Sequence, residues 1–551
     1  MRKSIFILLI TLVTVSCKQE EKKTDVAIAF DEKSVLEQQQ QHENERMRFK
    51  VLSPKVERAS VFITFEEALD KFGEDSYEKL YPLVIERSIP EIQESVASGE
   101  ITYREICLVY LWRMRKYEGD AETSLHTVIS LNPDILKQAA EKDRMREERG
   151  EVSYASIYGL PIMLKDNIGT EGMPTTAGAV ALKDNFAGDA FIVRQLKEAG
   201  ALILGKVNLS EWAYYFCEGC PLGYSAIGGQ TLNPYGPMVF ETGGSSSGSG
   251  VAVAANYAVA AVGTETSGSI LSPSSQNSVV GLKPTVGLLS RSGIVPISST
   301  LDTPGPMTRN VIDAAIMLNA MTGEDMNDGF SFTTDEDYVA GLSDVTLKGK
   351  RFGAFNSLVE SDSIYAATLD KIREAGAEVI MFDPPEDVNL NGFLTLLNID
   401  MKYDLPKYLE STASNEVGLR SIQQIVAFNE KDSLIRAPYN QDIFKGILAD
   451  STTTEQLEVI KQNLKENGRK FFNVPMETHD LDAVLSINNY HASYAAVAHY
   501  PALTVPMGYK TSGEPVSLTF IAASREEAKL FRLAYAFEQL TGVRKTPANY
   551  K

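Results

Sequence analysis

Cysteine is scarce in this sequence: four of 551 residues are cysteines, and only Cys217 and Cys220 lie close together. A zinc site built on such a pair needs a second Cys or His pair at comparable spacing, and none follows. We therefore predict neither a metal site nor any other cofactor. The pair itself fits a local disulfide or two buried free thiols equally well.

Positive charge is also in short supply. Lys and Arg number 53 against 73 Asp and Glu, which gives a formal net charge of -20. Nucleic acids and anionic membrane faces attract basic patches, so this balance argues against nucleic acid and against docking on lipid headgroups through charge. Nothing in the sequence implies an obligate protein partner.

The apolar run near the start of the chain, Ile5 to Val15, is too short to span a bilayer as a mature helix. It follows the basic start Met1-Arg2-Lys3 and precedes the small residue Ser16, an order typical of a secretory signal. The ending Thr14-Val-Ser-Cys17 resembles a lipobox, in which cleavage precedes a cysteine that carries lipid. Ordinary cleaved secretion and a retained anchor are the alternatives.

This reading sets the expected domain organisation and localisation. We expect residues 1–16 to be a lipoprotein-type signal peptide and residues 17–60 to be a polar tether from lipidated Cys17, because that stretch has few apolar residues to bury. The lipid would anchor the protein to a bilayer of the bacterial cell envelope, expected to be the outer membrane, facing the periplasm or the exterior. Residues 61–551 would form the folded domain.

Buried strands alternate with helices through this domain. Ile162–Leu164 and Ala201–Gly205 are short apolar strand candidates, and Phe191–Glu198 between them is a helix candidate. Thr102, three residues before Glu105, predicts a capping box at the start of another helix. Such alternation predicts an α/β architecture.

Three segments carry candidate chemistry. Lys165 ends the apolar strand candidate, and serines crowd between glycines in Gly243-Gly-Ser-Ser-Ser-Gly-Ser-Gly250. A second glycine-containing turn, Gly263-Thr-Glu-Thr-Ser-Gly-Ser-Ile270, contains Ser269. The long small-residue run between the two turns makes a flexible linker improbable, because linkers lack such buried stretches.

Together these segments resemble the amidase signature family, whose loop reads Gly-Gly-Ser-Ser-Gly-Gly-Ser and whose nucleophile segment reads Gly-Thr-Asp/Glu-x-x-Gly-Ser-Ile. Val280-Gly-Leu-Lys-Pro-Thr-Val-Gly287 and Asp302-Thr-Pro-Gly-Pro-Met-Thr-Arg309 also look like the family's. The resemblance covers roughly residues 88–322 and 484–541 and is closest to bacterial peptide amidases. It implies an α/β fold with a large mixed β-sheet covered by helices on both faces (α/β/α).

The resemblance also implies a Ser–Ser–Lys triad: Ser269 as the nucleophile, Ser245 as the bridge and Lys165 as the terminal base. A serine hydroxyl attacks well only when a neighbour removes its proton, and lysine can do so only as the neutral amine. Burial would supply the required lowering of the Lys165 pKa. Ser246 and Asp166 are expected to support these groups.

An oxyanion hole is implied at the same turn. The backbone N–H groups of Thr266, Ser267, Gly268 and Ser269 would stabilise the negative oxygen of the tetrahedral intermediate, and losing one such donor typically costs about 2.7–4 kcal/mol. The expected reaction is hydrolysis of a carboxylic amide to acid and ammonia through an acyl-Ser269 intermediate.

Two other functions remain as alternatives. Gly244-Ser-Ser246-Ser-Gly248 matches the nucleophile elbow of α/β-hydrolases, which would make Ser246 the nucleophile of an esterase served by His479, His491 or His499. The other alternative is a catalytically silent envelope binding protein on the same scaffold, since a fold does not establish activity.

These motifs do not identify the substrate. The resemblance suggests a peptide C-terminal amide, and small aliphatic, aryl or fatty acyl amides remain open. A more polar segment with a helical pattern at about 385–480 is expected to shape the substrate entrance.

Overall fold

The computed structural model describes residues 30–56, 60–150 and 152–551. Residues Glu32–Lys551 form one compact unit. The predicted signal peptide, residues 1–16, and Cys17 lie outside the described residues. Among the residues that are described, no helix has the length and apolar character needed to cross a bilayer.

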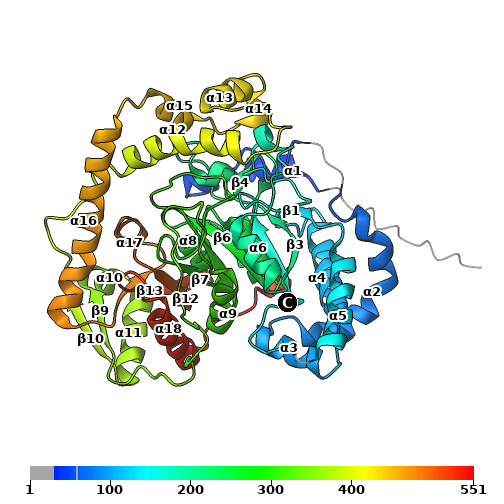
Figure 1. Cartoon of the computed structure of the whole chain (residues 1–551), viewed down its shortest axis with the longest axis horizontal. Helices are drawn as coiled ribbons and strands as arrows, with labels where there is room; N and C mark the ends of the chain where they lie inside the picture. The colour runs from blue at the N-terminus through cyan, green and yellow to red at the C-terminus, as the bar shows by residue number, and fades with distance from the viewer. Residues whose placement is uncertain (1–29, 57–59, 151) are drawn as a thin grey trace, which may run out of the picture. The chain divides into compact units, whose positions relative to one another are not determined.

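An eleven-stranded mixed sheet organises the described part of the chain (Figure 1). Its strands, in spatial order, are β1 (Val128–Leu131), β3 (Leu202–Val207), β2 (Pro161–Lys165), β6 (Ala260–Glu265), β8 (Thr303–Thr308), β7 (Val280–Lys283), β12 (Ala502–Tyr509), β13 (Pro515–Ile521), β11 (Ala483–Ile487), β9 (Arg351–Phe355) and β10 (Glu378–Phe382). Neighbouring strands are parallel from β3 through β2 to β6 and from β11 through β9 to β10. The edge pair β1–β3 and the pairs between β6 and β11 are antiparallel. Two short strands, β4 (Tyr224–Ser225) and β5 (Gly229–Gln230), form a separate hairpin.

Helices cover the sheet. The α-helices of the described residues are α1 (Glu32–Gln39), α2 (Glu66–Leu80), α3 (Ile89–Ala97), α4 (Tyr103–Glu118), α5 (Ile135–Arg149), α6 (Phe191–Glu198), α7 (Ser247–Ala254), α8 (Leu271–Gln276), α9 (Val311–Met321), α10 (Asn356–Ser361), α11 (Ser363–Glu374), α12 (Phe393–Ser411), α13 (Ile422–Glu430), α14 (Ser433–Arg436), α15 (Asp442–Ala449), α16 (Thr454–His479), α17 (Ala492–Ala498) and α18 (Glu527–Thr541). Short 3-10 helices are η1 (Glu45–Met47), η2 (Ile63–Phe65), η3 (Tyr81–Leu83), η4 (Val180–Leu182), η5 (Glu211–Tyr214) and η6 (Ala548–Tyr550). The expected α/β fold with a large mixed sheet is confirmed.

Local sequence explains where several of these elements begin and end. The capping box predicted at Thr102 is present: its hydroxyl accepts the Glu105 N–H at 3.1 Å, and the Glu105 carboxylate accepts the Thr102 N–H at 2.9 Å. These bonds satisfy N–H groups that a helix start leaves unpaired. Strands β2, β3 and β6 are buried along their whole length, as expected for parallel strands covered on both faces.

Helix α7 is built almost entirely from small residues, and every one of its residues is buried. Its close approach to the neighbouring chain requires glycine at Gly248, where a Cβ atom would lie 2.4 Å from the Asn208 carbonyl oxygen. The Gly248 N–H donates to that same oxygen at 3.0 Å. The N-terminus of α7, which follows the Ser245–Ser246 turn, is therefore held directly against the end of β3.

Residues 32–56 differ from the solvated tether expected for residues 17–60. Met47, Phe49, Val51 and Leu52 are buried, so the folded unit begins before residue 61. Apolar side chains alternate with polar ones here, a period-two pattern that lets an extended segment bury one side. The Leu52 carbonyl accepts the Gln230 N–H at 2.8 Å.

Residues 393–479 contain the five helices α12 to α16, which pack as a helical insert beside the sheet (Figure 1). The Phe444 ring lies 5.3 Å from the Trp212 ring and 5.1 Å from the Phe216 ring, centroid to centroid. Cys217 and Cys220, next to this contact, form a disulfide, which decides between the two states that the sequence left open. In the described residues no cluster of side chains could hold a metal ion.

Two acidic side chains meet at the start of α9. The Glu538 carboxyl accepts the Val311 N–H at 3.0 Å, and the Asp313 carboxyl accepts the Ile89 N–H at 2.8 Å. Burial raises the pKa of Glu538 to about 8 and that of Asp313 to about 7, and the charge of Asp313 further raises the Glu538 pKa. Both carboxyls therefore hold protons in the folded chain at pH values where they would ionise in the unfolded chain.

The raised pKa values of these two carboxyls predict that the free energy of unfolding falls as pH rises. Because the folded pKa of Glu538 lies above its unfolded value, its contribution is complete below about pH 4 and disappears as pH passes through about 8. Glu538→Gln keeps the acceptor for Val311 and removes the titration. We expect its Tm to decline less than that of the wild type between pH 5 and pH 8.5, measured by calorimetry.

The exposed Glu374, at the end of α11, provides the control: Glu374→Gln should retain the pH dependence of the wild type. A Glu538→Gln variant whose Tm falls with pH as steeply as that of the wild type would contradict the assignment.

Candidate active site

Lys165 ends strand β2, one of three neighbouring parallel strands. Its register partner on β3 is Val207, and the next strand on the other side, β6, ends at Glu265. Because the carboxyl ends of parallel strands meet at one edge of a sheet, this edge gathers Lys165 with the turn that follows Glu265.

The Lys165 amine is completely buried and lies among hydroxyl and carbonyl oxygens. Its Nζ is hydrogen-bonded to Ser245 Oγ at 2.8 Å, to Thr264 Oγ1 at 2.8 Å and to the Thr264 carbonyl at 3.1 Å. Burial lowers the pKa of Lys165 to about 7, and the carboxylates of Asp302 and Glu265 oppose this shift. A substantial fraction of the amine is therefore neutral near neutral pH.

The turn at Ser245 is held on two sides. The Gly244–Ser245 peptide bond is cis. The Ser245 carbonyl accepts the Ser210 N–H at 3.0 Å, and the next residue, Ser246, donates its N–H to the Ser269 carbonyl at 3.1 Å. The two glycine- and serine-rich turns therefore lie side by side, with Lys165 bonded to the first of them.

Ser246 connects the same turn to strand β6. Its hydroxyl donates to the Thr264 carbonyl at 3.0 Å and accepts the Thr264 N–H at 3.2 Å. Both bonds occupy a hydroxyl that the nucleophile-elbow alternative would need for attack. His491 instead bonds Ser486 Oγ at 2.7 Å, and in the described part of the chain no histidine bonds Ser246.

The turn at Ser269 is shaped by the Glu265 carboxylate. This buried group accepts the N–H of Gly268 at 2.7 Å, of Ile270 at 2.6 Å and of Leu271 at 3.0 Å. Burial raises the Glu265 pKa, whereas the charge of Lys283 and the three N–H bonds lower it. The carboxylate thus fixes the backbone on both sides of Ser269.

The oxyanion-hole prediction changes in one position. Because the Gly268 N–H donates to Glu265, it is not available for a substrate oxygen. Across the residues that the structure describes, the N–H groups of Thr266, Ser267 and Ser269 have no such acceptor. The Ser267 hydroxyl lies 2.9 Å from Ser493 Oγ, which holds this stretch against α17.

Asp166 lies in a separate network. Its carboxylate is 3.2 Å from the Lys206 amine, and both side chains are completely buried. Thr176 donates its hydroxyl and its N–H to the other carboxylate oxygen. Asp166 therefore makes its bonds to Lys206 and Thr176, and its support of the site is limited to bracing the end of β2.

Three residues of the site carried no role in the sequence-based prediction: Thr264, Glu265 and Asp302. The Asp302 carboxylate accepts the Thr266 hydroxyl at 2.5 Å and the Ile297 N–H at 2.8 Å, and burial raises its pKa to about 6. All three belong to the motifs that carry the family resemblance. In the sequence, the only sign of a role for these residues is that polar side chains follow an apolar strand. That pattern does not indicate which groups the side chains contact.

A cleft of about 790 Å³ leads to this site. It is lined by Thr264 and Thr266, by the stretch 291–299, and by Asp404, Lys407 and Tyr408 of α12. Pockets of this size hold drug-sized ligands. The helical insert therefore borders the entrance.

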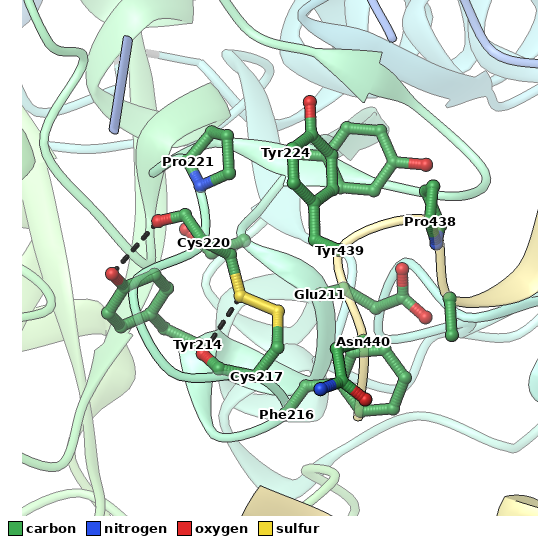
Figure 2. A pocket seen from close by; sticks show the side chains of 12 residues that line it. Glu211, Tyr214, Phe216, Cys217, Cys220, Pro221, Tyr224, Pro438, Tyr439 and Asn440 are labelled. Carbon is green, nitrogen blue, oxygen red and sulfur yellow. Dashed lines mark hydrogen bonds between the residues drawn. A yellow bond between two sulfur atoms is a disulfide. The ribbon is translucent and has the colours of Figure 1, made fainter. Parts of the chain in front are cut away.

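A second cavity, beside the Cys217–Cys220 disulfide, is far smaller, about 10 Å³. Figure 2 shows Glu211, Tyr224 and Tyr439 around it. A cavity of this volume is just enough for one water molecule. The large cleft, and not this cavity, can accept an amide substrate.

Comparisons with known proteins agree on the family. Residues 111–531 match the family model Amidase. A probable amidase of Arabidopsis thaliana is 37% identical over 478 residues, which cover 84% of this chain and 91% of the plant protein. An amidase family protein from Bacillus anthracis has 37% identity and a TM-score of 0.84, covering 90% of this chain and 99% of that chain. The peptide amidase from Stenotrophomonas maltophilia has 37% identity and a TM-score of 0.79, covering 84% and 98%.

The same comparisons correct the predicted localisation. Two curated relatives that each cover 84% of this chain come from eukaryotes, the plant Arabidopsis thaliana and the yeast Schizosaccharomyces pombe. Their origin contradicts the assignment to a bacterial cell envelope, which rested on a short motif at Cys17.

The family match extends over all the segments described above. The buried lysine, the two serine-containing turns and the cleft lie inside residues 111–531, and the solved relatives share the sheet that positions them. The chain belongs to the amidase signature family and is an enzyme that hydrolyses amides.

Proposed function

We propose that this enzyme hydrolyses peptide C-terminal amides to acid and ammonia through an acyl intermediate on Ser269. One observation carries the mechanism: a fully buried lysine amine with a pKa of about 7 is hydrogen-bonded to Ser245, and the adjoining Ser246 is bonded to the backbone of Ser269. This arrangement supplies a base at neutral pH without a histidine.

The first half of the reaction forms the acyl-enzyme. Ser269 Oγ attacks the carbonyl carbon while its proton passes to Ser245 Oγ, and the proton of Ser245 passes to the neutral Lys165 amine. The carbonyl oxygen becomes negative and is stabilised by backbone N–H groups. When the C–N bond breaks, the proton returns from Lys165 through Ser245 to the nitrogen, which leaves as neutral ammonia.

The second half releases the acid. Water attacks the Ser269 ester and gives its proton to the same relay, and the ester C–O bond then breaks to regenerate the serine hydroxyl. The N–H groups of Thr266, Ser267 and Ser269 are the proposed donors to the negative oxygen, since Gly268 is engaged by Glu265. Thr266 is itself held by Asp302, which keeps these donors in place.

The choice of substrate class rests on two observations. The Stenotrophomonas maltophilia relative, 37% identical, is a peptide amidase. The cleft, about 790 Å³, is lined by both polar and apolar groups along the stretch 291–299, which suits a short peptide with backbone and side-chain groups. We propose that the insert at residues 393–479 shapes this entrance.

The substrate proposal is tested by ammonia release from four amide classes: peptide amides, small aliphatic amides, aryl amides and long-chain acyl amides. We expect kcat/KM to be highest for peptide amides. A higher value for another class would replace the proposed substrate while leaving the acyl-enzyme mechanism in place.

Ser269→Ala should lower kcat/KM by on the order of 10⁴–10⁶, because the alanine has no oxygen to attack the carbonyl. Its Tm should stay close to that of the wild type, since the hydroxyl is partly exposed and its removal leaves the backbone bonds to Ser246 intact. A fluorophosphonate should label the wild type and not the variant. Ser512→Ala, in the exposed turn between β12 and β13 and outside the cleft lining, is the matched control and should keep full activity.

The lowered pKa of Lys165 predicts how kcat/KM depends on pH. Only the neutral amine accepts a proton, so kcat/KM should rise with pH through about 7 on loss of a single proton. Lys165→Met removes the base and should lower the rate at pH 8 by roughly 10²–10⁴. Normal rates in this variant, or a wild-type profile flat between pH 5.5 and 8.5, would refute the role of Lys165.

A further inference from the structure

A second hollow, about 370 Å³, adjoins the active-site cleft. It shares two wall residues with the cleft, Ser299 and Phe330, so the two spaces meet along them. We call this hollow the side cavity. Its other walls are Thr300, Leu301, Leu396, Glu458, Lys461, Gln462, Leu464, Lys465, Val497 and His499. The side cavity therefore lies directly beside the space in which a substrate would bind.

Two lysines of α16 face the side cavity, and their surroundings differ. Lys461 lies 3.1 Å from Asp400 and 3.4 Å from Glu458, so its charge is compensated. Lys465, one helical turn further on, has no carboxylate within 4 Å among the residues of the described chain. Partial burial and the nearby charge of Arg469 lower the Lys465 pKa. Lys465 is thus a half-buried cation without a counterion.

The opposite wall adds no negative charge. His499 is mostly buried, and its pKa falls to about 3 through burial and the charges of Lys465, Lys283, Arg469 and Arg291, so its ring is neutral. These cations all raise the electrostatic potential at the ring. Glu458, on α16 itself, is the acidic residue that lines the side cavity, and it is exposed and paired with Lys461.

Phe330 lines both the active-site cleft and the side cavity. Its ring lies 4.8 Å from the Arg291 guanidinium and 6.0 Å from the His499 ring, which hold it in place. Arg291 in turn pairs with Asp328, so its charge is compensated. Of the cations lining the side cavity, Lys465 is left to bind an anion that enters from the cleft.

We propose that the side cavity is a subsite for a substrate carboxylate, which pairs with the Lys465 ammonium while the scissile amide lies at Ser269. The preferred substrates are then peptide amides with an acidic side chain upstream of the amidated residue. This inference rests on the proposed peptide-amide activity. A substrate with a neutral side chain leaves the ammonium unpaired in a partly dehydrated cavity, which creates the selectivity.

The test compares tripeptide amides that carry Glu or Gln at each position upstream of the amidated residue. For the wild type, we expect a Glu-over-Gln ratio in kcat/KM of roughly fivefold at one position, the size typical of a partly exposed ion pair. Lys465→Met should bring this ratio close to one, and Lys465→Arg should restore it. Raising the salt concentration should also reduce the ratio.

Lys470→Met is the matched control, since Lys470 lies on the same helix, pairs with Asp387 and does not line the side cavity. It should keep the wild-type ratio. A wild-type ratio near one at every position, or an unchanged ratio in Lys465→Met, would overturn the proposal. Comparison of Tm values identifies a Lys465→Met protein that has simply unfolded, in which case the Lys465→Gln variant is measured instead.

Binding separates this inference from the proposed activity. The same Glu and Gln peptide amides are titrated calorimetrically into Ser269→Ala and into Ser269→Ala with Lys465→Met. Tighter binding of the Glu peptide that disappears in the double variant supports the subsite even if no ammonia is released. Equal binding of the two peptides to Ser269→Ala rejects it, even if the enzyme is a normal peptide amidase.

Discussion

The site depends on burying one lysine amine where no carboxylate pairs with it. Desolvation of the Lys165 ammonium is costly, and the surrounding oxygens of Ser245 and Thr264 can bond the neutral amine as well as the charged one. Asp302 and Glu265 act on the amine only through their charge. Had either paired directly with Lys165, the amine would stay protonated and could not act as a base. Lys206 is equally buried but paired with Asp166, whose charge opposes the lowering of the Lys206 pKa by burial.

A second constraint is the shape of the two serine-containing turns. Three N–H groups around Ser269 converge on Glu265, and Ser246 bonds both the Ser269 backbone and strand β6. Each of these bonds is between buried groups, where an unpaired donor or acceptor would be unfavourable. The turns are consequently held by the fold before any substrate binds, as electrostatic stabilisation of a transition state requires.

The helical insert is attached to this framework from outside. Phe444 packs on Trp212 and Phe216, in a segment whose first residue, Ser210, bonds the Ser245 carbonyl. One short stretch of chain thus contacts the catalytic turn at one end and the insert at the other. This contact positions the insert relative to the site by apolar packing, whereas the site itself is positioned by hydrogen bonds.

The sequence by itself determined the family and the α/β class, and it singled out Lys165, Ser245 and Ser269 as the candidate catalytic residues. These features are local: an apolar strand before a lysine, glycines that permit tight turns, and a capping box readable from four residues. The prediction of a solvated tether was wrong for residues 32–56. The composition of this stretch is polar on average, but its apolar residues alternate with polar ones and are buried by tertiary contacts. The sequence-based prediction also placed Gly268 among the oxyanion donors, and gave no role to Thr264, Glu265 or Asp302.

Only the tertiary structure could decide those points, because each depends on which distant groups meet. The Gly268 N–H is engaged because the Glu265 carboxylate folds back over the turn, and Lys165 lies without a paired carboxylate because Asp302 is directed at Thr266. The side cavity arises where α16 passes the loop at Ser299, some 160 residues apart in sequence. Sequence motifs specify which chemical groups are available, and packing of segments far apart in the chain sets their charge state and their neighbours.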